Sequence, residues 1–511
     1  MNAKRAEDRT CPGEKCSISV AICRTRQRNQ YPKCLLCGHR SAEGAASLTT
    51  DPKVAASIFR STAVLGRVPD EINEYVIRKV GLAAAQFLRA ENPVSSRLVV
   101  ACDLRANSRG FTRIFCEGAS RGGLETVNAG TVPPEVLAFV LGTEPPPAAT
   151  GAAFVGGGNY GDDVNGVRLW RGDATPVGLG NGLDKISLIA RRFRTGCSRL
   201  PAGMRASTPV PDYVTYVRKF APKLDATKVA VDAGYGVASR LLEAVLAGTP
   251  VQMVPIHFEE KARNPYLGRK FPCAALASTM KGAVTEAGAA FGAAFDFTGE
   301  RIAFFDERGA LLRHDVAAGL IAAELLSRSP GACVTYDLRA TAALRARIGE
   351  AGGTPVAAPA RALAFAQHFR RNDALYGADL TGLHYFKDFF RFPSAVIALL
   401  MFCSHLSREK KPASELTADL RRFSQSDEIV IPMPSAEVAQ DVLSRMREEF
   451  PKAERELIDG LTVRLQDWWF NLRQHGEAAE LLLNVEGRTE REQRRGRQSV
   501  ERLVAKYASG S

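Results

Sequence analysis

The sequence predicts an α/β fold: three related α/β domains with mixed sheets, then a C-terminal α+β domain, preceded by a cysteine-rich arm. First, 511 residues are too many for a single hydrophobic core. Second, apolar strand-like runs alternate with helical patterns in three successive stretches, as in parallel or mixed sheets. Third, after about residue 421 the alternation changes to paired strand-like runs with helices. We expect the arm at 1–45 and the domains at 52–200, 201–308, 309–420 and 421–507.

The arm holds five of the eleven cysteines within its first 37 residues. Cys34 and Cys37 form a C-x-x-C-G turn, on which two thiolates can share one tetrahedral zinc ion. We expect Cys11 and Cys16 to complete this Zn²⁺ site, although Cys23 could replace one of them. The alternative is a disordered, cysteine-rich leader.

In the first α/β stretch, apolar residues recur at helical spacing and predict a helix that ends near residue 90. The apolar stripe consists of Ile72, Val76, Val80, Ala83, Ala84 and Phe87. A buried strand at 98–101, a helix at 111–120 and a strand at 125–130 should follow. This order predicts one β-α-β layer.

The same alternation of strands and helices is expected in the second and third stretches. A strand at 228–233, a helix at 238–247, a strand at 251–256 and a helix at 274–287 precede the run FGAAFDFTGERIAFF. The apolar run 396–402 is too short to span a membrane and predicts a buried helix segment. The charged residues 490–507 predict an amphipathic final helix.

Charge and composition narrow the class of protein. A net charge of +13 is concentrated in the arm, where residues 1–40 carry nine Lys or Arg and three Asp or Glu. Such an arm can attract nucleic acid, but Tyr31 is its single aromatic residue, so stacking on single strands is not expected. The start of the chain has no apolar signal segment, and a soluble cytoplasmic protein without membrane contact is expected.

The segment FVGGGNYG, residues 154–161, contains the spacing G-x-G-x-x-G. This motif marks a dinucleotide site only where a helix opens directly after it. Here the turn formers Asp162, Asp163, Asn165 and Gly166 follow, and then a β-type run. A nucleotide site is therefore disfavoured, and the loop has to be interpreted from its neighbours.

Several segments together point to a family. They are IFR near Phe59, VVACDLRANS with Asp103, Arg105 and Ser108, VAVDAGYG, and WFNLRQHGEAAELLLNVE. Over roughly residues 55–505 their order and spacing resemble the α-D-phosphohexomutase superfamily, which includes phosphoglucomutases and phosphomannomutases. The resemblance implies intramolecular phosphoryl transfer on a sugar phosphate through a phosphoserine, with Mg²⁺ as cofactor and a cradle for the substrate phosphate.

By this resemblance the phosphoserine falls at Gly157 and the neighbouring histidine at Gly158. Glycine offers neither a nucleophile nor a proton carrier. Arg168 occupies the place of a family lysine and keeps its charge, but it is a poor proton shuttle. Thr150 is too far upstream to replace the serine.

The family's metal loop D-x-D-x-D-R corresponds to Asp296, Thr298, Glu300 and Arg301. One carboxylate has become a hydroxyl and another is longer by a methylene group, so we expect weak or no Mg²⁺ binding. The alternative is a loop with a salt bridge from Asp296 or Glu300 to Arg301, the residue that would also border the substrate.

The sugar loop of the family corresponds to residues 377–383, in which Asp379 and Thr381 could bond sugar hydroxyls. The family histidine has become Leu383, and we expect the adjacent His384 to point elsewhere. In the phosphate cradle Arg473 remains, while Glu477 adds negative charge where phosphate would lie. The resemblance also implies a second anion-binding arginine near the start of the fold, but its segment corresponds to residues 63–66, Ala-Val-Leu-Gly, which contain no arginine.

Three functions are compatible with this pattern. A phosphohexomutase-like protein of carbohydrate metabolism that has lost catalysis would act in binding or regulation, with the arm contacting a protein partner. An active but divergent phosphoglucomutase or phosphomannomutase, an isomerase by reaction type, would use the retained Arg168, Asp296, Asp379 and Arg473. A nucleic-acid-associated protein would use the basic arm.

Overall fold

The computed structural model describes residues 9–11, 17–18, 22–23, 26–27, 34, 37, 53–143, 148–192, 204–221, 223–262, 264–476 and 478–509. Its contacts divide the chain into two units. Unit 1 is Met1–Val132 with Val140–Thr208, and unit 2 is Pro133–Phe139 with Pro209–Ser511. Helix α5 (Pro134–Thr143) begins in unit 2 and ends in unit 1. The predicted fold class is confirmed: several mixed sheets alternate with helices.

Unit 1 contains a seven-stranded mixed sheet in the order β3-β4-β8-β7-β5-β6-β9. In chain order its strands are β3 (Phe59–Arg60), β4 (Ala63–Arg67), β5 (Arg97–Cys102), β6 (Glu125–Thr131), β7 (Gly151–Val155), β8 (Val164–Arg171) and β9 (Arg205–Ala206). Strand β5 is parallel to β6 and β7, and β7 is antiparallel to β8. This central position explains why β5 is buried from its second residue on.

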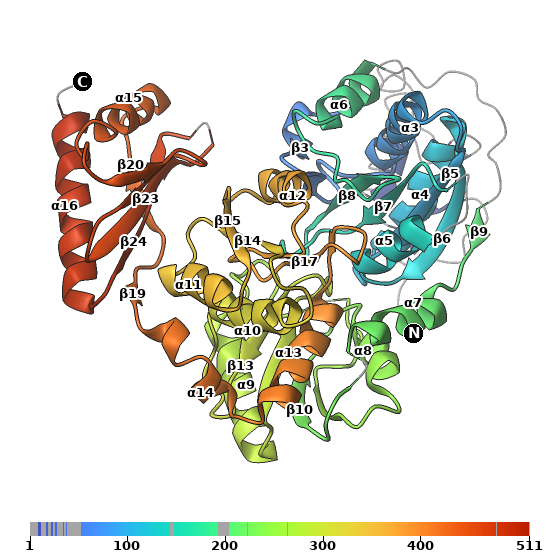
Figure 1. Cartoon of the computed structure of the whole chain (residues 1–511). Helices are drawn as coiled ribbons and strands as arrows, with labels where there is room; N and C mark the ends of the chain where they lie inside the picture. Colours follow the sequence, from blue (N-terminus) through green and yellow to red (C-terminus); the bar gives the residue numbers. More distant parts are fainter. Residues whose placement is uncertain are drawn as a thin grey trace, which may run out of the picture. The chain divides into compact units, whose positions relative to one another are not determined.

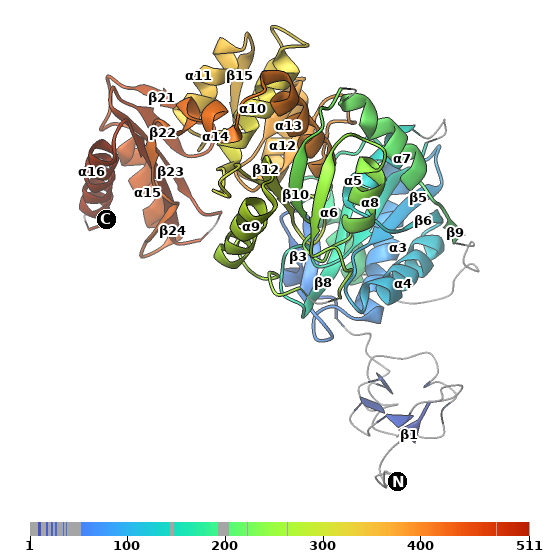
Figure 2. The same ribbon diagram turned by 90° about the horizontal axis from the view of Figure 1, so that it is seen from below.

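The helices of unit 1 pack on this sheet. They are η3 (Ala56–Ile58), α3 (Glu74–Glu91), α4 (Ser108–Arg121) and α6 (Leu183–Arg192). Asn73 caps α3 by accepting from Val76 N at 3.1 Å, and the predicted apolar stripe of this helix is buried. Figure 2 shows α3 and α4 side by side. They approach closely because Gly81 of α3 and Gly118 of α4 face each other's backbone.

Unit 2 contains two smaller sheets of the same kind. The first, β11-β10-β12-β13, joins β10 (Lys228–Asp232), β11 (Gln252–Ile256), β12 (Phe291–Phe295) and β13 (Ile302–Phe305). The second, β15-β14-β16-β17-β18, joins β14 (Cys333–Asp337), β15 (Thr354–Ala358), β16 (Tyr376–Ala378), β17 (His384–Phe386) and β18 (Phe392–Pro393).

Helices connect these strands. Beside the first sheet lie α7 (Val210–Val217), η4 (Arg218–Phe220), α8 (Ser239–Leu246) and α9 (Ala274–Ala287). With the second sheet come α10 (His314–Leu326), α11 (Ala342–Glu350), α12 (Ala362–Arg371), α13 (Ala395–Glu409), α14 (Ala413–Leu416) and η5 (Asp419–Arg421). The apolar run 396–402 lies in α13 and is buried on every side, as predicted. No described helix is both long and apolar enough to cross a membrane.

The last sheet of unit 2 is antiparallel along its described strand pairs. Its strands are β19 (Ser424–Gln425), β20 (Ile429–Pro432), β21 (Glu454–Glu456), β22 (Leu461–Arg464), β23 (Trp468–Gln474) and β24 (Glu480–Gly487). Two helices, α15 (Ala436–Met446) and α16 (Glu490–Ala508), pack against it, as Figure 1 shows. This last part of the chain thus has the α+β architecture that the predicted fold class includes.

The first three sheets share one topology, and this topology positions the candidate site. In each sheet, the first of three parallel strands in chain order (β5, β10 or β14) lies between the other two. The third parallel strand is followed in the chain by an antiparallel strand that pairs with it. The turns after β7, β12 and β16 are the glycine loop, the metal loop and the sugar loop of the sequence. Three motifs far apart in the chain thus occupy equivalent places in three related sheets.

In the arm, the structure describes a short antiparallel pair, β1 (Arg9–Thr10) and β2 (Ser17–Ile18). Cys11, Cys23, Cys34 and Cys37 are described, whereas Cys16 lies outside the described residues.

Candidate functional site

The glycine loop of unit 1 follows β7 and is tied to the end of β5. Gly157 N donates to the Asp103 carboxylate at 3.0 Å, and Gly156 N donates to Gly166 O at 3.0 Å. Arg105 pairs with Asp103 and donates through Nη2 to Gly158 O at 3.1 Å and to Tyr160 O at 2.6 Å. Both Asp103 and Arg105 are buried. Two backbone N–H groups of this glycine turn, those of Gly156 and Gly157, are therefore engaged by the protein's own carbonyl and carboxylate and are not available to an anion.

There is no room for a side chain at Gly157. A Cβ on this residue would lie 2.3 Å from Val164 O and 2.7 Å from Arg105 Cζ. Contacts this short are not tolerated between a Cβ and backbone, so a serine here requires the loop to move. Gly158 differs, because it has φ +59° and a Cβ there would have Tyr160 Cδ2, at 4.0 Å, as its nearest neighbour.

Arg168 lies on β8, opposite Phe154 of β7. Its guanidinium carbon lies 5.2 Å from the centre of the Phe154 ring and 5.5 Å from that of Trp170. The side chain is thus placed by cation–π contacts next to the strand that leads into the glycine loop. Thr150 precedes β7, at the opposite end of this strand, so the structure keeps its hydroxyl away from Gly157.

The residues of the metal loop in unit 2 form hydrogen bonds with one another. Thr298 Oγ1 lies 3.1 Å from Asp296 Oδ1 and 3.0 Å from Glu300 Oε2, and Glu300 N donates to Asp296 Oδ1 at 2.9 Å. All three residues are buried. One oxygen of each carboxyl group, Asp296 Oδ1 and Glu300 Oε2, thus contacts the threonine hydroxyl, and Asp296 Oδ1 also accepts from the loop backbone.

This arrangement does not fit Mg²⁺, which requires about six oxygens near 2.1 Å. Across the described residues, no three His, Cys, Asp or Glu side chains gather in a way that could hold a metal ion. In the metal loop itself, the Thr298 hydroxyl lies between two carboxyl groups that a metal would otherwise share.

The sugar loop is built in the same way. Asp379 Oδ1 accepts from Thr381 N and Oγ1, both at 2.8 Å, and from Leu383 N at 3.1 Å. Burial raises the pKa of the Asp379 carboxyl, and the nearby Arg301 guanidinium offsets this only in part. Ile302 N donates to Gly382 O at 3.0 Å, so the metal loop and the sugar loop are joined within unit 2.

His384 points away from the sugar loop, as expected. It is buried on β17, where Nδ1 lies 2.6 Å from the Tyr376 hydroxyl. Burial lowers its pKa to about 3, which keeps the imidazole neutral. The residue therefore belongs to the hydrophobic interior and not to the loop that precedes it.

Arg473 of the expected phosphate cradle lies on β23 and is buried. Its Nη1 donates to the side-chain oxygens of Asn471 and Asn484, both at 3.0 Å, and its Nη2 pairs with Glu428. Arg339 donates to the same Glu428 oxygen at 3.2 Å. A carboxylate of the chain thus occupies the charged face of Arg473. Glu477 lies outside the described residues.

The arm brings four cysteines near one another. Burial, followed by the neighbouring thiols of Cys11, Cys23 and Cys37, raises the pKa of Cys34. Cys37 N donates to Cys34 O at 3.4 Å, which forms the expected turn. Arg26 and Gln27 donate to the sulfurs of Cys11 and Cys23, each at 3.2 Å. These four described cysteines are not arranged as a metal-binding group.

Three residues important for these contacts could not be assigned their partners from sequence alone: Arg105, Arg339 and Glu428. Arg105 and Arg339 carry a signal, because each belongs to a D-L-R segment at the carboxyl end of the central parallel strand, β5 or β14, and each pairs with the aspartate two residues earlier. Glu428 carries no such signal, since it lies in a connection between β19 and β20.

Comparisons with known proteins agree with the family that the sequence resembles. Residues 56–178 match the family model "Phosphoglucomutase/phosphomannomutase, alpha/beta/alpha domain I", and residues 313–423 match domain III of the same family. A phosphomannomutase of Salmonella typhimurium is 28% identical over 451 residues, covering 84% of this chain and 94% of that protein.

Solved structures show the same fold. A phosphoglucomutase/phosphomannomutase family protein from Burkholderia thailandensis superposes with a TM-score of 0.77 at 23% identity, covering 90% of this chain and 99% of that one. The N-acetylphosphoglucosamine mutase of Aspergillus fumigatus, solved with GlcNAc-6P and magnesium, gives a TM-score of 0.53 at 12% identity, covering 85% and 96%.

Proposed function

Because this chain belongs to the α-D-phosphohexomutase superfamily, we propose that it is a phosphohexomutase-like protein that no longer transfers phosphoryl groups and acts in binding or regulation. The observation that carries this proposal is Gly157, which has neither a hydroxyl nor room for one. Without a covalent phosphoryl carrier, the reaction of the family cannot be divided into its two steps.

The other loops support the same proposal. Thr298, Thr381 and Glu428 each supply an internal partner for a group that a metal, a sugar or a phosphate would otherwise engage. We propose that Mg²⁺ binds weakly or not at all, and that Arg168 no longer moves a proton. Asp379, Thr381 and Arg301 remain the best candidates for contact with a sugar phosphate, the class of ligand bound by the Aspergillus fumigatus mutase.

A mutase assay tests this proposal. The full chain is supplied with glucose 1-phosphate or mannose 1-phosphate, a sugar bisphosphate activator and Mg²⁺, and the 6-phosphate product is followed. We expect no turnover, while a phosphomannomutase assayed in parallel confirms the reagents. Turnover that is abolished by Asp379→Asn or Arg473→Met would contradict the proposal.

The second candidate is an active, divergent phosphoglucomutase or phosphomannomutase. It is favoured by Asp296, Asp379 and Arg473, which keep the residue types that the family chemistry uses. The same assay decides between the two functions.

We also propose that the chain is divided into four domains at residues 52–200, 201–308, 309–420 and 421–507, and that the protein is cytoplasmic.

Zinc binding by the arm remains a prediction. The predicted ligands are Cys11, Cys16, Cys34 and Cys37, with Cys23 as a possible replacement for one of them, and Cys16 lies outside the described residues. Metal analysis of the purified full chain tests it, with Cys34→Ser/Cys37→Ser as the control. Equal zinc content in both proteins, or none in either, would contradict it.

The role of the arm in contacting a protein or a nucleic acid also remains a prediction. Deleting residues 1–45 should weaken any salt-dependent nucleic-acid binding.

A further inference from the structure

The final helix, α16, carries a row of exposed arginines. It lies along the last sheet of unit 2 (Figure 1). The side chains that it buries recur at helical spacing and are Gln493, Gly496, Val500 and Val504. At about 100° per residue, the opposite side of the helix is occupied by four exposed residues, which are Arg491, Arg495, Gln498 and Arg502. We call these four residues the arginine row.

The arginines beside the row are neutralised by carboxylates of the same helix. Arg494 pairs with Glu490, and Arg497 Nε donates to Glu501 Oε1 at 2.8 Å. Both pairs follow the i, i+4 spacing of a helix surface. They leave the charges of the row itself unchanged.

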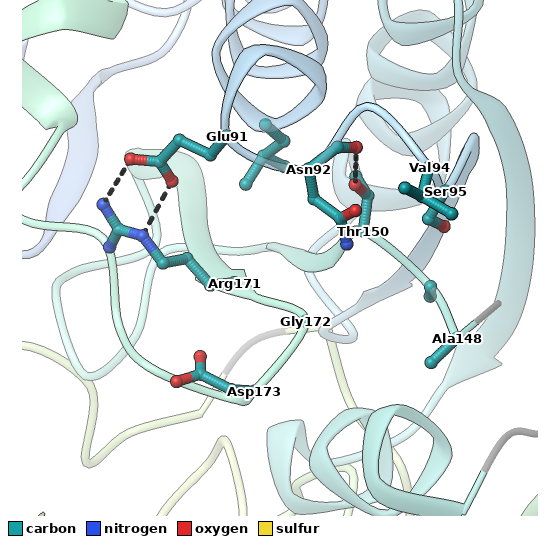
Figure 3. A pocket seen from close by; sticks show the side chains of 11 residues that line it. Glu91, Asn92, Val94, Ser95, Ala148, Thr150, Arg171, Gly172 and Asp173 are labelled. Carbon is teal, nitrogen blue, oxygen red and sulfur yellow. Dashed lines mark hydrogen bonds and ion pairs between the residues drawn. The ribbon is translucent and has the colours of Figure 1, made fainter. Parts of the chain in front are cut away.

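The row differs from the arginines that stabilise the fold. Figure 3 shows one of these, Arg171, which is held by Glu91 through Nε to Oε2 at 2.8 Å and Nη2 to Oε1 at 3.1 Å. Within the part of the chain that the structure describes, no hydrogen bond or ion pair engages the three guanidinium groups of the row. The row therefore presents three uncompensated positive charges.

The helix that carries the row is firmly seated. At its start, Thr489 Oγ1 accepts from Glu492 N at 3.3 Å and so caps the helix. In its middle, Gly496 lets the helix approach β23 so closely that a Cβ there would lie 2.4 Å from Trp468 Cε3. Because the backbone under the row is already ordered, binding through the row costs little ordering of the chain.

The length of the row fits a chain of phosphates. From Arg491 to Arg502 it extends over about 16 Å at 1.5 Å per residue. One strand of a DNA duplex carries a charge about every 3.4 Å along its axis, so the row runs beside about five phosphates. A guanidinium group can bond a phosphate through two parallel N–H groups, which favours arginine over lysine at such a surface.

The composition of this surface separates a duplex from other polyanions. None of the exposed large hydrophobic side chains of the described residues lies on α16. Single strands are bound by stacking on aromatic rings, and helices on a membrane surface insert apolar side chains into it. The apolar residues of α16 are instead packed in the core of the last sheet. A duplex backbone is the partner that charge alone can bind.

We propose that the arginine row of α16 binds the phosphate backbone of duplex DNA without reading its sequence. The row lies outside the loops that correspond to the family's reaction, so this binding does not depend on whether catalysis is lost. The net charge of +13 adds a general attraction for the duplex.

Titration of a short fluorescent DNA duplex with the full chain, at salt concentrations between about 50 and 200 mM, tests the proposal. We expect the affinity to fall as salt rises. The plot of log K against log salt should be shallower for Arg491→Gln/Arg495→Gln/Arg502→Gln by about 0.9 per arginine, or roughly 2.7 in total. The basic arm is present in both proteins, so its contribution cancels from this difference.

Two control variants separate the row from net charge. Glu490→Gln/Arg494→Gln removes an ion pair from the same helix at unchanged net charge. Lys185→Gln/Lys281→Gln/Arg371→Gln removes as many positive charges as the triple row variant, at exposed positions of α6, α9 and α12. In each control the slope should change by less than about 1, which corresponds to one phosphate contact.

Urea unfolding verifies that every variant is folded. The proposal is overturned by the absence of salt-dependent duplex binding, by an unchanged slope in the triple row variant, or by an equal loss of slope in the scattered variant. Tighter binding to vesicles of anionic phospholipid than to the duplex would also overturn it and would assign the row to a membrane surface.

Discussion

Gly157 combines two properties that separately exclude a phosphoryl carrier. It has no hydroxyl, and its Cα lies where any Cβ would meet the Val164 carbonyl oxygen and the Arg105 guanidinium. The first property could be changed by one substitution. The second involves the loop backbone and a buried arginine that is bonded to Asp103, so it belongs to the local structure as a whole.

The substitution Gly157→Ser therefore should not restore activity, and it should lower the free energy of unfolding by on the order of 1–3 kcal/mol through overpacking. Gly158→Asn is the matched control. It adds a side chain in open space, and asparagine tolerates the positive φ of this position, so its cost should stay below about 1 kcal/mol. Urea unfolding measures both. Equal stability of Gly157→Ser and the native protein would show that the loop moves freely.

The sequence predicted which residue types of the family motifs this chain lacks, but it could not predict which contacts its own residues make at those positions. Gly157, Thr298 and Leu383 were identifiable because the motifs around them align in order. The Asp103 contact to Gly157 N and the pairing of Arg473 with Glu428 join residues 54 and 45 positions apart. Contacts at that separation follow from sheet topology, which a single sequence does not determine.

At the scale of elements, the three loops after β7, β12 and β16 share one feature. Each is stabilised by hydrogen bonds from its own residues or from the end of the neighbouring strand. Strand and helix positions such as α9 and α16 followed the apolar periodicity closely, because burial of one face dominates their formation. Loop conformation depends on individual polar contacts, so it was not predictable in the same way.

The metal loop gives a test at this scale. Addition of Mg²⁺ should not raise the Tm of the native protein, because Thr298 bridges Asp296 and Glu300. In Thr298→Asp/Glu300→Asp, which rebuilds the alternating aspartates, Mg²⁺ should raise the Tm. A rise in the native protein that equals the rise in this variant would contradict the assignment.

Helix α5 provides a pH-dependent test of packing in unit 2. Glu135 in its first turn is buried and accepts a hydrogen bond from Ser394, the cap of α13. Burial raises the pKa of this carboxyl to about 8, against the hydrogen bonds of Ser394 and Tyr213. The folded protein keeps Glu135 protonated, while the unfolded chain ionises above its ordinary pKa near 4.5. The native protein thus loses stability as pH rises from about 4.5 to about 8.

The substitution Glu135→Gln removes this penalty. Relative to the native protein, the variant should be more stable at pH 8 than at pH 4.5, by on the order of a few kcal/mol. Glu286→Gln, at an exposed site of α9, should show the same difference at both pH values. Unfolding free energies at the two pH values provide the measurement, and a pH-independent effect of Glu135→Gln would contradict a buried, protonated carboxyl.

For the whole molecule, the chain has the fold of the phosphohexomutase structures it resembles, and the proposed function is that this fold serves without the family's chemistry. Glycines such as Gly81, which lies against α4, let the elements of this fold pack closely. Fold alone does not determine function, and here the site residues argue for a different use of the same framework.

The most direct test of catalytic loss asks whether the protein can carry a phosphoryl group. The intact full chain is incubated with glucose 1,6-bisphosphate and Mg²⁺, and its mass is measured, with a phosphomannomutase treated in parallel. We predict no mass increase for this protein and an increase of one phosphoryl group for the mutase. A phosphoryl adduct that maps to residues 150–168 and disappears when mannose 1-phosphate is added would contradict the loss of phosphoryl transfer.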